Sequence, residues 1–126
     1  GPGRIGNLAQ SMEVNSLAEL VKNALKADGI KIIGQLEQRV EKIAVVGGSG
    51  AFLIPEAASR GAQVMITGDV KYHEAQEANA LGLTVLDAGH RATEMPAVEY
   101  LSAFLQENLP ELRCKMVSPQ PFEFWL

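Results

Sequence analysis

Two stretches of this 126-residue sequence carry side chains that could perform acid–base or metal chemistry. His90 and Glu94 follow Gly89 and lie four residues apart, a spacing that puts an imidazole and a carboxylate on one face of a helix. Asp69 and His73 repeat that spacing. Mixed nitrogen and oxygen ligands bind divalent ions, so we predict that His90 and Glu94 are metal ligands. Because zinc commonly takes about four ligands, this pair makes only half a site.

Each of these residues also has a purely structural alternative. Asp69 and Glu94 could cap the amino ends of helices, where carboxylates are favoured. His73 and His90 could be hydrogen-bonded histidines with no ligand role. The spacing alone leaves both readings open.

The glycine-rich turn Gly47–Gly50 comes directly after an apolar run and could present backbone amides to a phosphate. The Gly-Lys-Ser/Thr of a P-loop is absent, and a dinucleotide fingerprint would have glycine where Leu53 stands. The alternative is a tight strand-to-helix turn with Ser49 as the helix cap. A nucleotide-binding domain that uses this turn is therefore a third functional hypothesis.

The hydrophobic pattern predicts the elements that position these residues. Ser16 and Glu19 form a capping box for a helix that ends at Asp28-Gly29. Further along we expect short strands at 30–33 and 43–46, a connection at 35–42, a helix at about 94–108 with Pro96 in its first turn, a strand at 113–117 and an aromatic edge strand or docking segment at 122–125.

A repeat at an offset of 21 residues predicts two successive helix–turn–strand units. Its matched pairs are Glu56-Ala57 with Glu77-Ala78, Gly61 with Gly82, Val64 with Val85, and Gly68 with Gly89. In this register Asp69 and His90 occupy equivalent positions, each directly after the last matched glycine of its unit. Right-handed crossovers would then place Gly47–Gly50, Asp69 and His90 at the carboxyl ends of three neighbouring strands.

Composition limits the class of protein. With 47% apolar residues the chain can form one domain with its own core, and its net charge of −4 argues against a nucleic-acid partner. The single cysteine, Cys114, cannot form an intrachain disulfide, and we expect a buried structural thiol. With neither a membrane-length apolar segment nor a leader pattern, we expect a soluble, cytoplasmic protein that does not bind membranes.

Four motifs together resemble the carboxyl-terminal half of the Nif-three-like family, whose members are often labelled GTP cyclohydrolase type-two homologues. The resemblance runs from Gly3 to the Phe122-Glu123-Phe124 tail. The motifs are the loop of Gly3, Arg4 and Gly6, the run Val46–Gly50, the run Thr67–His73, and Asp87–His90 with Glu94.

The resemblance implies a three-layer α/β/α fold with a mainly parallel sheet, in which residues 1–126 are one domain and the carboxyl-terminal half of a larger two-half protein. It also implies a two-metal site. A histidine pair and an aspartate from the amino-terminal half would join His90 and Glu94, and dimers would assemble into a hexameric ring. This chain lacks that first half, so its own metal site is incomplete.

We therefore expect a metal-dependent hydrolase in the intact protein, with this half alone inactive. His90 would bind one metal and Glu94 would bridge both, while Asp69 and His73 would orient ligands or transfer protons during hydrolysis of a small-molecule substrate. The ligand types do not distinguish zinc, manganese, iron and magnesium. The alternative is a non-catalytic module in which the metal serves assembly or partner binding.

Overall fold

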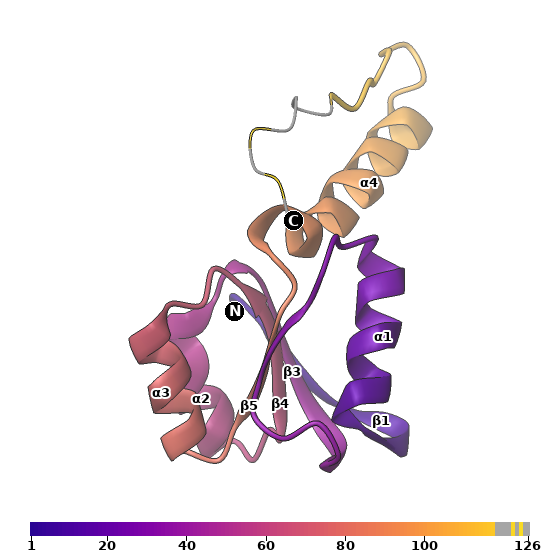
Figure 1. Ribbon diagram of the computed structural model, residues 1–126. Helices are drawn as coiled ribbons and strands as arrows, with labels where there is room; N and C mark the ends of the chain where they lie inside the picture. Colours follow the sequence, from indigo (N-terminus) through magenta and orange to yellow (C-terminus); the bar gives the residue numbers. More distant parts are fainter. Residues whose placement is uncertain (118–121, 123, 125–126) are drawn as a thin grey trace.

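The computed structural model describes residues 1–117, 122 and 124. Their strands form a five-stranded sheet in the order β1-β3-β4-β5-β2 (Figure 1). The three central strands are parallel, and each edge strand is antiparallel to its neighbour. In chain order the elements are β1 (Arg4–Glu13), α1 (Val14–Leu25), β2 (Lys31–Ile33), β3 (Arg39–Ser49), η1 (Ala51–Leu53), α2 (Ile54–Ser59), β4 (Val64–Gly68), α3 (Tyr72–Ala80), β5 (Thr84–Asp87) and α4 (His90–Asn108).

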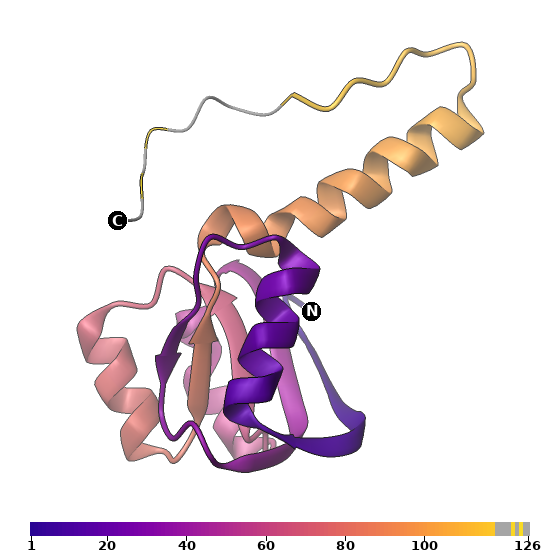
Figure 2. The same ribbon diagram turned by 45° about the vertical axis from the view of Figure 1, so that its right-hand side comes forward.

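Helices cover both faces of the sheet, which confirms the predicted three-layer α/β/α fold (Figures 1 and 2). On one face α1 packs Leu17 and Val21 against Val64 and Leu86. On the other face η1, α2 and α3 enclose a second apolar cluster around Met65. Every residue of β4 is buried, as expected for the middle strand of a sheet that is covered on both faces.

The 21-residue repeat corresponds to α2–β4 and α3–β5. Gly61 and Gly82 each have a positive φ, 78° and 69°, just after the helices of the two units. This left-handed conformation, which glycine adopts without steric cost, ends each helix and turns the chain into a buried strand. The two units therefore begin and end in equivalent ways, and their following loops emerge at the same edge of the sheet.

The amino-terminal region differs from its prediction. Arg4 to Gly6, expected in a loop, belong to β1, which pairs with β3 as an antiparallel edge strand. The capping box was wrong, because α1 starts at Val14 after Glu13, which makes no side-chain cap. The helix also ends before Asp28: Leu25 is its last residue, and Lys26 caps it with a φ of 52°.

Other boundaries also moved. β3 begins at Arg39, so the predicted connection at 35–42 was too long by four residues. α4 begins at His90 rather than Glu94, which places Pro96 inside the helix. The strand predicted at 113–117 is not formed, and Cys114 lies partly exposed outside the core rather than buried. Most of the predicted aromatic segment at 122–125 lies outside the described residues, and Phe122 and Phe124 are in no strand.

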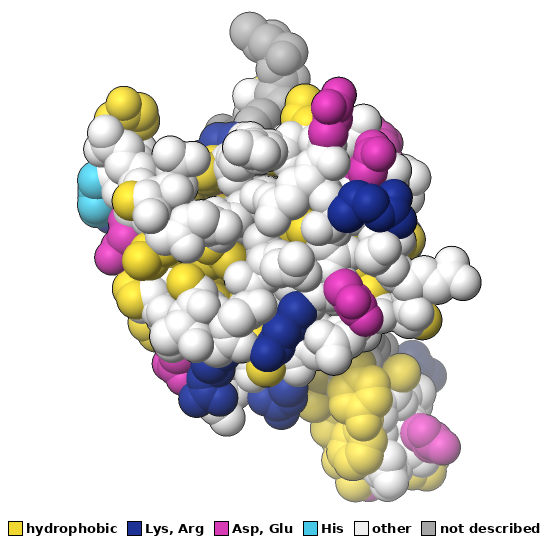
Figure 3. All heavy atoms as spheres, turned by 90° about the horizontal axis from the view of Figure 1, so that it is seen from below, with side chains coloured by type: hydrophobic (Ala, Val, Ile, Leu, Met, Phe, Trp, Pro, Cys, Tyr) yellow, Lys and Arg dark blue, Asp and Glu magenta, His cyan; other side chains and the backbone are white. Residues whose placement is uncertain are grey.

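Helix α4 extends away from the sheet, and none of its 19 residues is buried (Figures 1 and 2). Hydrophobic side chains gather on this projecting part, seen in the distance at lower right in Figure 3. Large exposed apolar residues of the helix are Val98, Tyr100, Leu101 and Phe104. No helix among the described residues is both long and apolar enough to cross a membrane.

Candidate metal-binding site

Ser49, Asp69 and His90 meet at the carboxyl ends of the three parallel strands. Ser49 is the last residue of β3, Asp69 follows β4, and His90 begins α4 three residues after the end of β5. The Ser49 hydroxyl donates to Asp69 Oδ2 at 2.6 Å, and the same oxygen lies 2.6 Å from Nδ1 of His90. The contact between Asp69 and His90 joins the two positions that the repeat places in register.

The site continues along the first turns of α4. Nε2 of His90 lies 3.2 Å from Oε1 of Glu94, one helical turn further on. The His90, Asp69 and Glu94 side chains are 48, 51 and 55% exposed, so water or an ion can reach them directly. His90 therefore presents one ring nitrogen to Asp69 and the other to Glu94.

The carboxylates and the imidazole change each other's proton affinity. The hydrogen bond from Ser49, followed by the one from His90, holds the pKa of Asp69 below its usual value. The hydrogen bond to Asp69 raises the pKa of His90, and the charge of Glu94 adds to this effect. Without a bound cation, the site therefore favours an anionic Asp69 beside a protonated His90.

Close backbone approach holds this geometry. A Cβ at Gly68 would lie 2.7 Å from both the carbonyl carbon of Gly89 and the backbone nitrogen of His90, so only glycine lets β4 end against the start of α4. Thr93 ties the helix to β3, because its hydroxyl accepts a 2.9 Å hydrogen bond from the Gly48 N–H. The same hydroxyl donates back to α4, within reach of the carbonyl oxygens of Gly89 and His90.

These atoms fit one face of a divalent-ion site. Two ligand atoms that each lie about 2.1 Å from one ion are about 3.0 to 3.4 Å apart for octahedral to tetrahedral angles. The observed separation of Nε2 and Oε1 is 3.2 Å. Asp69 at Nδ1 is the carboxylate partner that metal-binding histidines commonly have, because it fixes the tautomer with a lone pair on Nε2. Among the described residues no group of three or more His, Cys, Asp or Glu could hold an ion.

Comparison with known proteins identifies the family. A model of the family described as DUF34/NIF3 (NGG1p interacting factor 3) matches residues 1–121. The chain belongs to the DUF34/NIF3 family. A NIF3-related protein of Bacillus cereus has the same fold, with a TM-score of 0.82 and 33% identity over 99% of this chain and 36% of that one.

Curated proteins from several bacteria match this sequence at similar identity. Proteins named GTP cyclohydrolase 1 type 2 homolog match at 35% identity in Listeria innocua, over 98% of this chain and 35% of the relative. The corresponding match in Clostridium perfringens has 34% identity over 98% of this chain and 48% of the relative. The chain therefore spans less than half the length of these relatives.

The structure groups three of the predicted site residues and separates the fourth. Asp69, His90 and Glu94 lie together, whereas His73 is exposed on α3 and takes no part in the contacts of this group. Its role in proton transfer stays a prediction. Asp69 is not the cap of α3, because that position belongs to Lys71. Sequence reasoning treated Ser49 only as a possible cap and missed Thr93.

The glycine-rich turn is already engaged within the NIF3 fold. The Gly48 N–H donates to Thr93, and the Gly50 N–H lies within reach of two acceptors, the Thr67 hydroxyl and the Gly48 carbonyl oxygen. Ser49 caps no helix, and its hydroxyl bonds Asp69 instead. Two of the amides that a phosphate would need are used inside the fold, which disfavours the nucleotide-binding turn.

Proposed function

We propose that this chain is the carboxyl-terminal, metal-facing half of a metal-dependent hydrolase. One observation carries the proposal: His90 Nε2 and Glu94 Oε1 lie 3.2 Å apart, and Asp69 holds the opposite ring nitrogen of His90. Divalent ions bound there would lower the pKa of a water molecule and polarise an oxygen of the substrate. The name of the curated relatives, GTP cyclohydrolase 1 type 2 homolog, supports a hydrolytic reaction and makes GTP one substrate to test.

The chain's own side chains have distinct tasks in this proposal. Asp69 accepts the Nδ1 proton of His90 and is itself held by the Ser49 hydroxyl, so the imidazole keeps one orientation. Neutral His90 then offers its Nε2 lone pair, and Glu94 offers an anionic oxygen beside it. The exposure of all three side chains leaves room for further ligands from outside the described residues.

Those further ligands would come from the rest of a larger protein. The family resemblance implies a histidine pair and an aspartate from an amino-terminal half, two metals in each site and a hexameric ring of dimers. The exposed apolar surface of α4 is consistent with such an assembly, because a helix without any buried residue normally packs against something.

Paired variants of the intact protein test the proposal. Glu94→Gln keeps the size of the side chain but removes the anionic ligand, whereas Glu99→Gln makes the same change on α4 outside the site. We expect Glu94→Gln to lower both metal content, measured by elemental mass spectrometry, and hydrolysis of a panel that includes GTP. Glu99→Gln should leave metal content unchanged. Full activity and full metal content in Glu94→Gln would rule out the ligand role.

A second candidate function is a non-catalytic module in which metal holds an assembly together. The exposed Tyr100, Leu101 and Phe104 on α4 favour it. In that case a chelator would dissociate the oligomer, as measured by light scattering. No compound in the hydrolysis panel would be turned over. Turnover that disappears with the metal while the oligomer stays intact would favour the enzyme.

A further inference from the structure

Asp87 contacts both of the loops that carry the candidate metal-binding site. It is the last residue of β5, and its side chain is only 10% exposed. Its Oδ2 accepts the Val70 N–H at 3.0 Å, and its Oδ1 accepts the Gly89 N–H at 3.0 Å. Val70 directly follows Asp69, and Gly89 directly precedes His90. One carboxylate therefore bonds the backbone next to each residue of the Asp69–His90 contact.

The backbone at both places has a left-handed conformation. The φ of Asp69 is 57°, and the φ of Gly89 is 86°. Glycine adopts this conformation without steric cost, but Asp69 has a Cβ and is strained there. Strain of this kind persists only where surrounding contacts hold it. The hydrogen bond from Asp87 to the N–H that follows Asp69 is such a contact.

Lys31 holds the same loop from the edge of the sheet. β2 pairs with β5 so that Lys31 lies opposite Asp87. The Lys31 ammonium lies 3.2 Å from Asp87 Oδ2 and donates to the Val70 carbonyl oxygen at 2.7 Å. Both polar groups of the Val70 backbone are thus bonded, the N–H by Asp87 and the carbonyl oxygen by Lys31. These bonds fix the peptide units on both sides of Val70.

The contact between Asp69 and His90 depends on where these two backbones lie. Asp69 Oδ2 accepts from the Ser49 hydroxyl and lies 2.6 Å from His90 Nδ1. Asp69 and His90 belong to different loops, after β4 and after β5, and a shift of either loop would lengthen this distance. Hydrogen bonds weaken steeply as their geometry departs from the ideal.

We propose that Asp87 is a positioning residue that holds Asp69 and His90 in hydrogen-bonding contact. It acts through the backbone N–H groups that follow Asp69 and precede His90. Lys31 supports it by bonding the same carboxylate and the same loop. The consequence for metal binding rests on the proposed function, in which Asp69 fixes the His90 tautomer that has a lone pair on Nε2.

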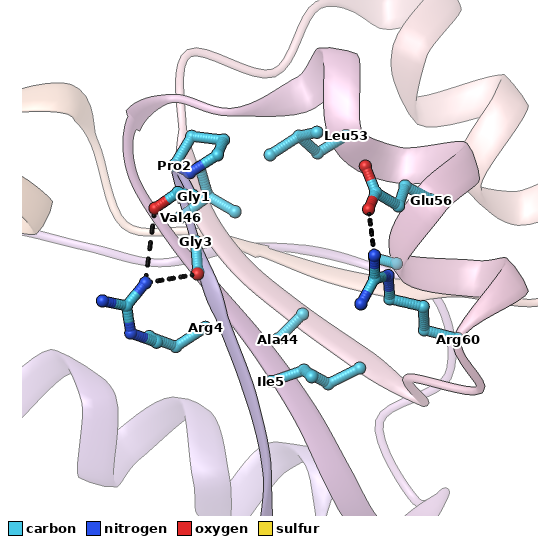
Figure 4. Close-up of a pocket in the computed structure, with 11 residues that line it drawn as sticks. Gly1, Pro2, Gly3, Arg4, Ile5, Ala44, Val46, Leu53, Glu56 and Arg60 are labelled. Atoms are coloured by element: carbon cyan, nitrogen blue, oxygen red, sulfur yellow. Dashed lines mark hydrogen bonds and ion pairs between the residues drawn. The ribbon is translucent and has the colours of Figure 1, made fainter.

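A second ion pair provides a matched control. Glu56 and Arg60 on α2 pair at 2.7 Å and line a cavity of about 190 Å³ next to the amino-terminal residues (Figure 4). Neither Asp69 nor Asp87 nor His90 lines this cavity. Glu56→Gln is therefore the same change from acid to amide as Asp87→Asn, and it also removes the anion of an ion pair, but away from the site.

The His90 ring in the metal-free, intact protein gives the first measurement. Ring ¹⁵N chemical shifts, recorded above the pKa of His90, show which nitrogen of the neutral imidazole carries the proton. Because Asp69 accepts at Nδ1, the wild-type proton should lie mainly on Nδ1. Asp87→Asn offers one acceptor oxygen to two N–H groups and turns its NH₂ toward one of them. The Nδ1–H population should therefore fall, whereas Glu56→Gln should leave it unchanged.

Calorimetric titration with Zn²⁺ gives the second measurement. Asp87→Asn should lower the affinity roughly tenfold, as losses of groups that orient metal-binding histidines do. In an Asp69→Asn background the same change should have a much smaller effect, because the contact that Asp87 supports is already lost. Lys31→Met keeps the apolar stem and removes the ammonium, so it should shift both measurements in the same direction by less. It tests the same support if Asp87→Asn does not fold.

Two results would overturn the inference. The first is an unchanged Nδ1–H population in Asp87→Asn and in Lys31→Met, or in Lys31→Met alone if Asp87→Asn does not fold. The second is an equal loss of Zn²⁺ affinity from Asp87→Asn with Asp69 present and with Asp69 replaced, because Asp87 would then act independently of Asp69.

This inference and the proposed function can fail separately. If the wild-type protein binds no Zn²⁺ but its His90 ring responds to Asp87→Asn, the positioning role stands and the metal site fails. If Glu94→Gln loses metal and activity while Asp87→Asn changes neither measurement, the hydrolase stands and the positioning role fails.

Discussion

Replacing Gly48 with alanine should weaken metal binding, whereas an equally strained glycine replacement away from the site should not. A Cβ at this position would lie 2.6 Å from Glu94 Oε1 and 3.2 Å from His90 Nε2, the two proposed ligand atoms. Ordinary contact begins at 3.4 Å, so the carboxylate oxygen would retreat by about 0.8 Å. Metal–ligand distances tolerate only about 0.2 Å, and we therefore expect affinity to fall at least about tenfold.

Gly82→Ala is the matched control for the backbone strain of this substitution. Gly48 and Gly82 have φ values of 65° and 69°, but a Cβ at Gly82 would meet no atom within 4 Å. Both alanine variants should lose about 1 to 2 kcal/mol of unfolding free energy, the cost of a left-handed conformation for a residue with a Cβ. Urea denaturation measures this loss, and calorimetric metal titration measures affinity. Equal metal affinity in the two variants would refute the assignment of Glu94 and His90 as neighbouring ligands.

The Asp69–His90 pair and helix α4 provide further predictions. Asp69→Asn should return the pKa of His90 toward its usual value in an NMR titration and reduce metal affinity about 10- to 100-fold. In metal-free protein the Asp69–His90 pair should stabilise the fold fully between pH 3.8 and 6.5, the usual pKa values of the two groups. This stabilisation should be lost as the pH rises through the raised pKa of His90. It should also be lost as the pH falls through the lowered pKa of Asp69. A wild-type minus Asp69→Asn difference in urea stability that stays constant with pH would contradict this. Phe104→Asp on α4 should dissociate the oligomer in light-scattering measurements, whereas an already monomeric wild-type protein would exclude this interface.

The sequence predicted the buried parallel strands well because their signals are local. Val64–Gly68 and Thr84–Asp87 follow glycines that end helices, and all of their residues except Asp87 are buried. β1 carries no comparable signal. Its residues are mostly exposed, and it is a strand because it pairs with β3, a contact between segments distant in sequence.

The same distinction applies to the site. The repeat register predicted that Asp69 and His90 would occupy equivalent strand ends, and the structure places them in contact. Ser49 stands one residue away from that register, and its hydroxyl reaches Asp69 because β3 continues far enough for Ser49 to pair with Gly68. Thr93 could not be predicted as part of the site, because its position depends on α4 beginning at His90, and the sequence pattern predicted a start four residues later. The repeat therefore predicted which residues lie at equivalent strand ends. The contacts of Ser49 and Thr93 depend on where β3 ends and where α4 begins, and these boundaries were known only from the structure.

Helix α4 links the proposed metal site to the proposed assembly. Its first turns carry His90 and Glu94 against the sheet, and the remainder projects with its apolar residues exposed. Phe104 lies 14 residues beyond His90, about 21 Å along the helix, so it cannot touch an ion held at the strand ends. If the missing ligands come from whatever packs on α4, Phe104→Asp should still lower metal affinity, and restoring the assembly should restore it. Unchanged metal affinity in a fully dissociated Phe104→Asp variant would mean that the missing ligands do not come from the partner that packs on α4. Assembly and metal binding would then be separate properties of this protein.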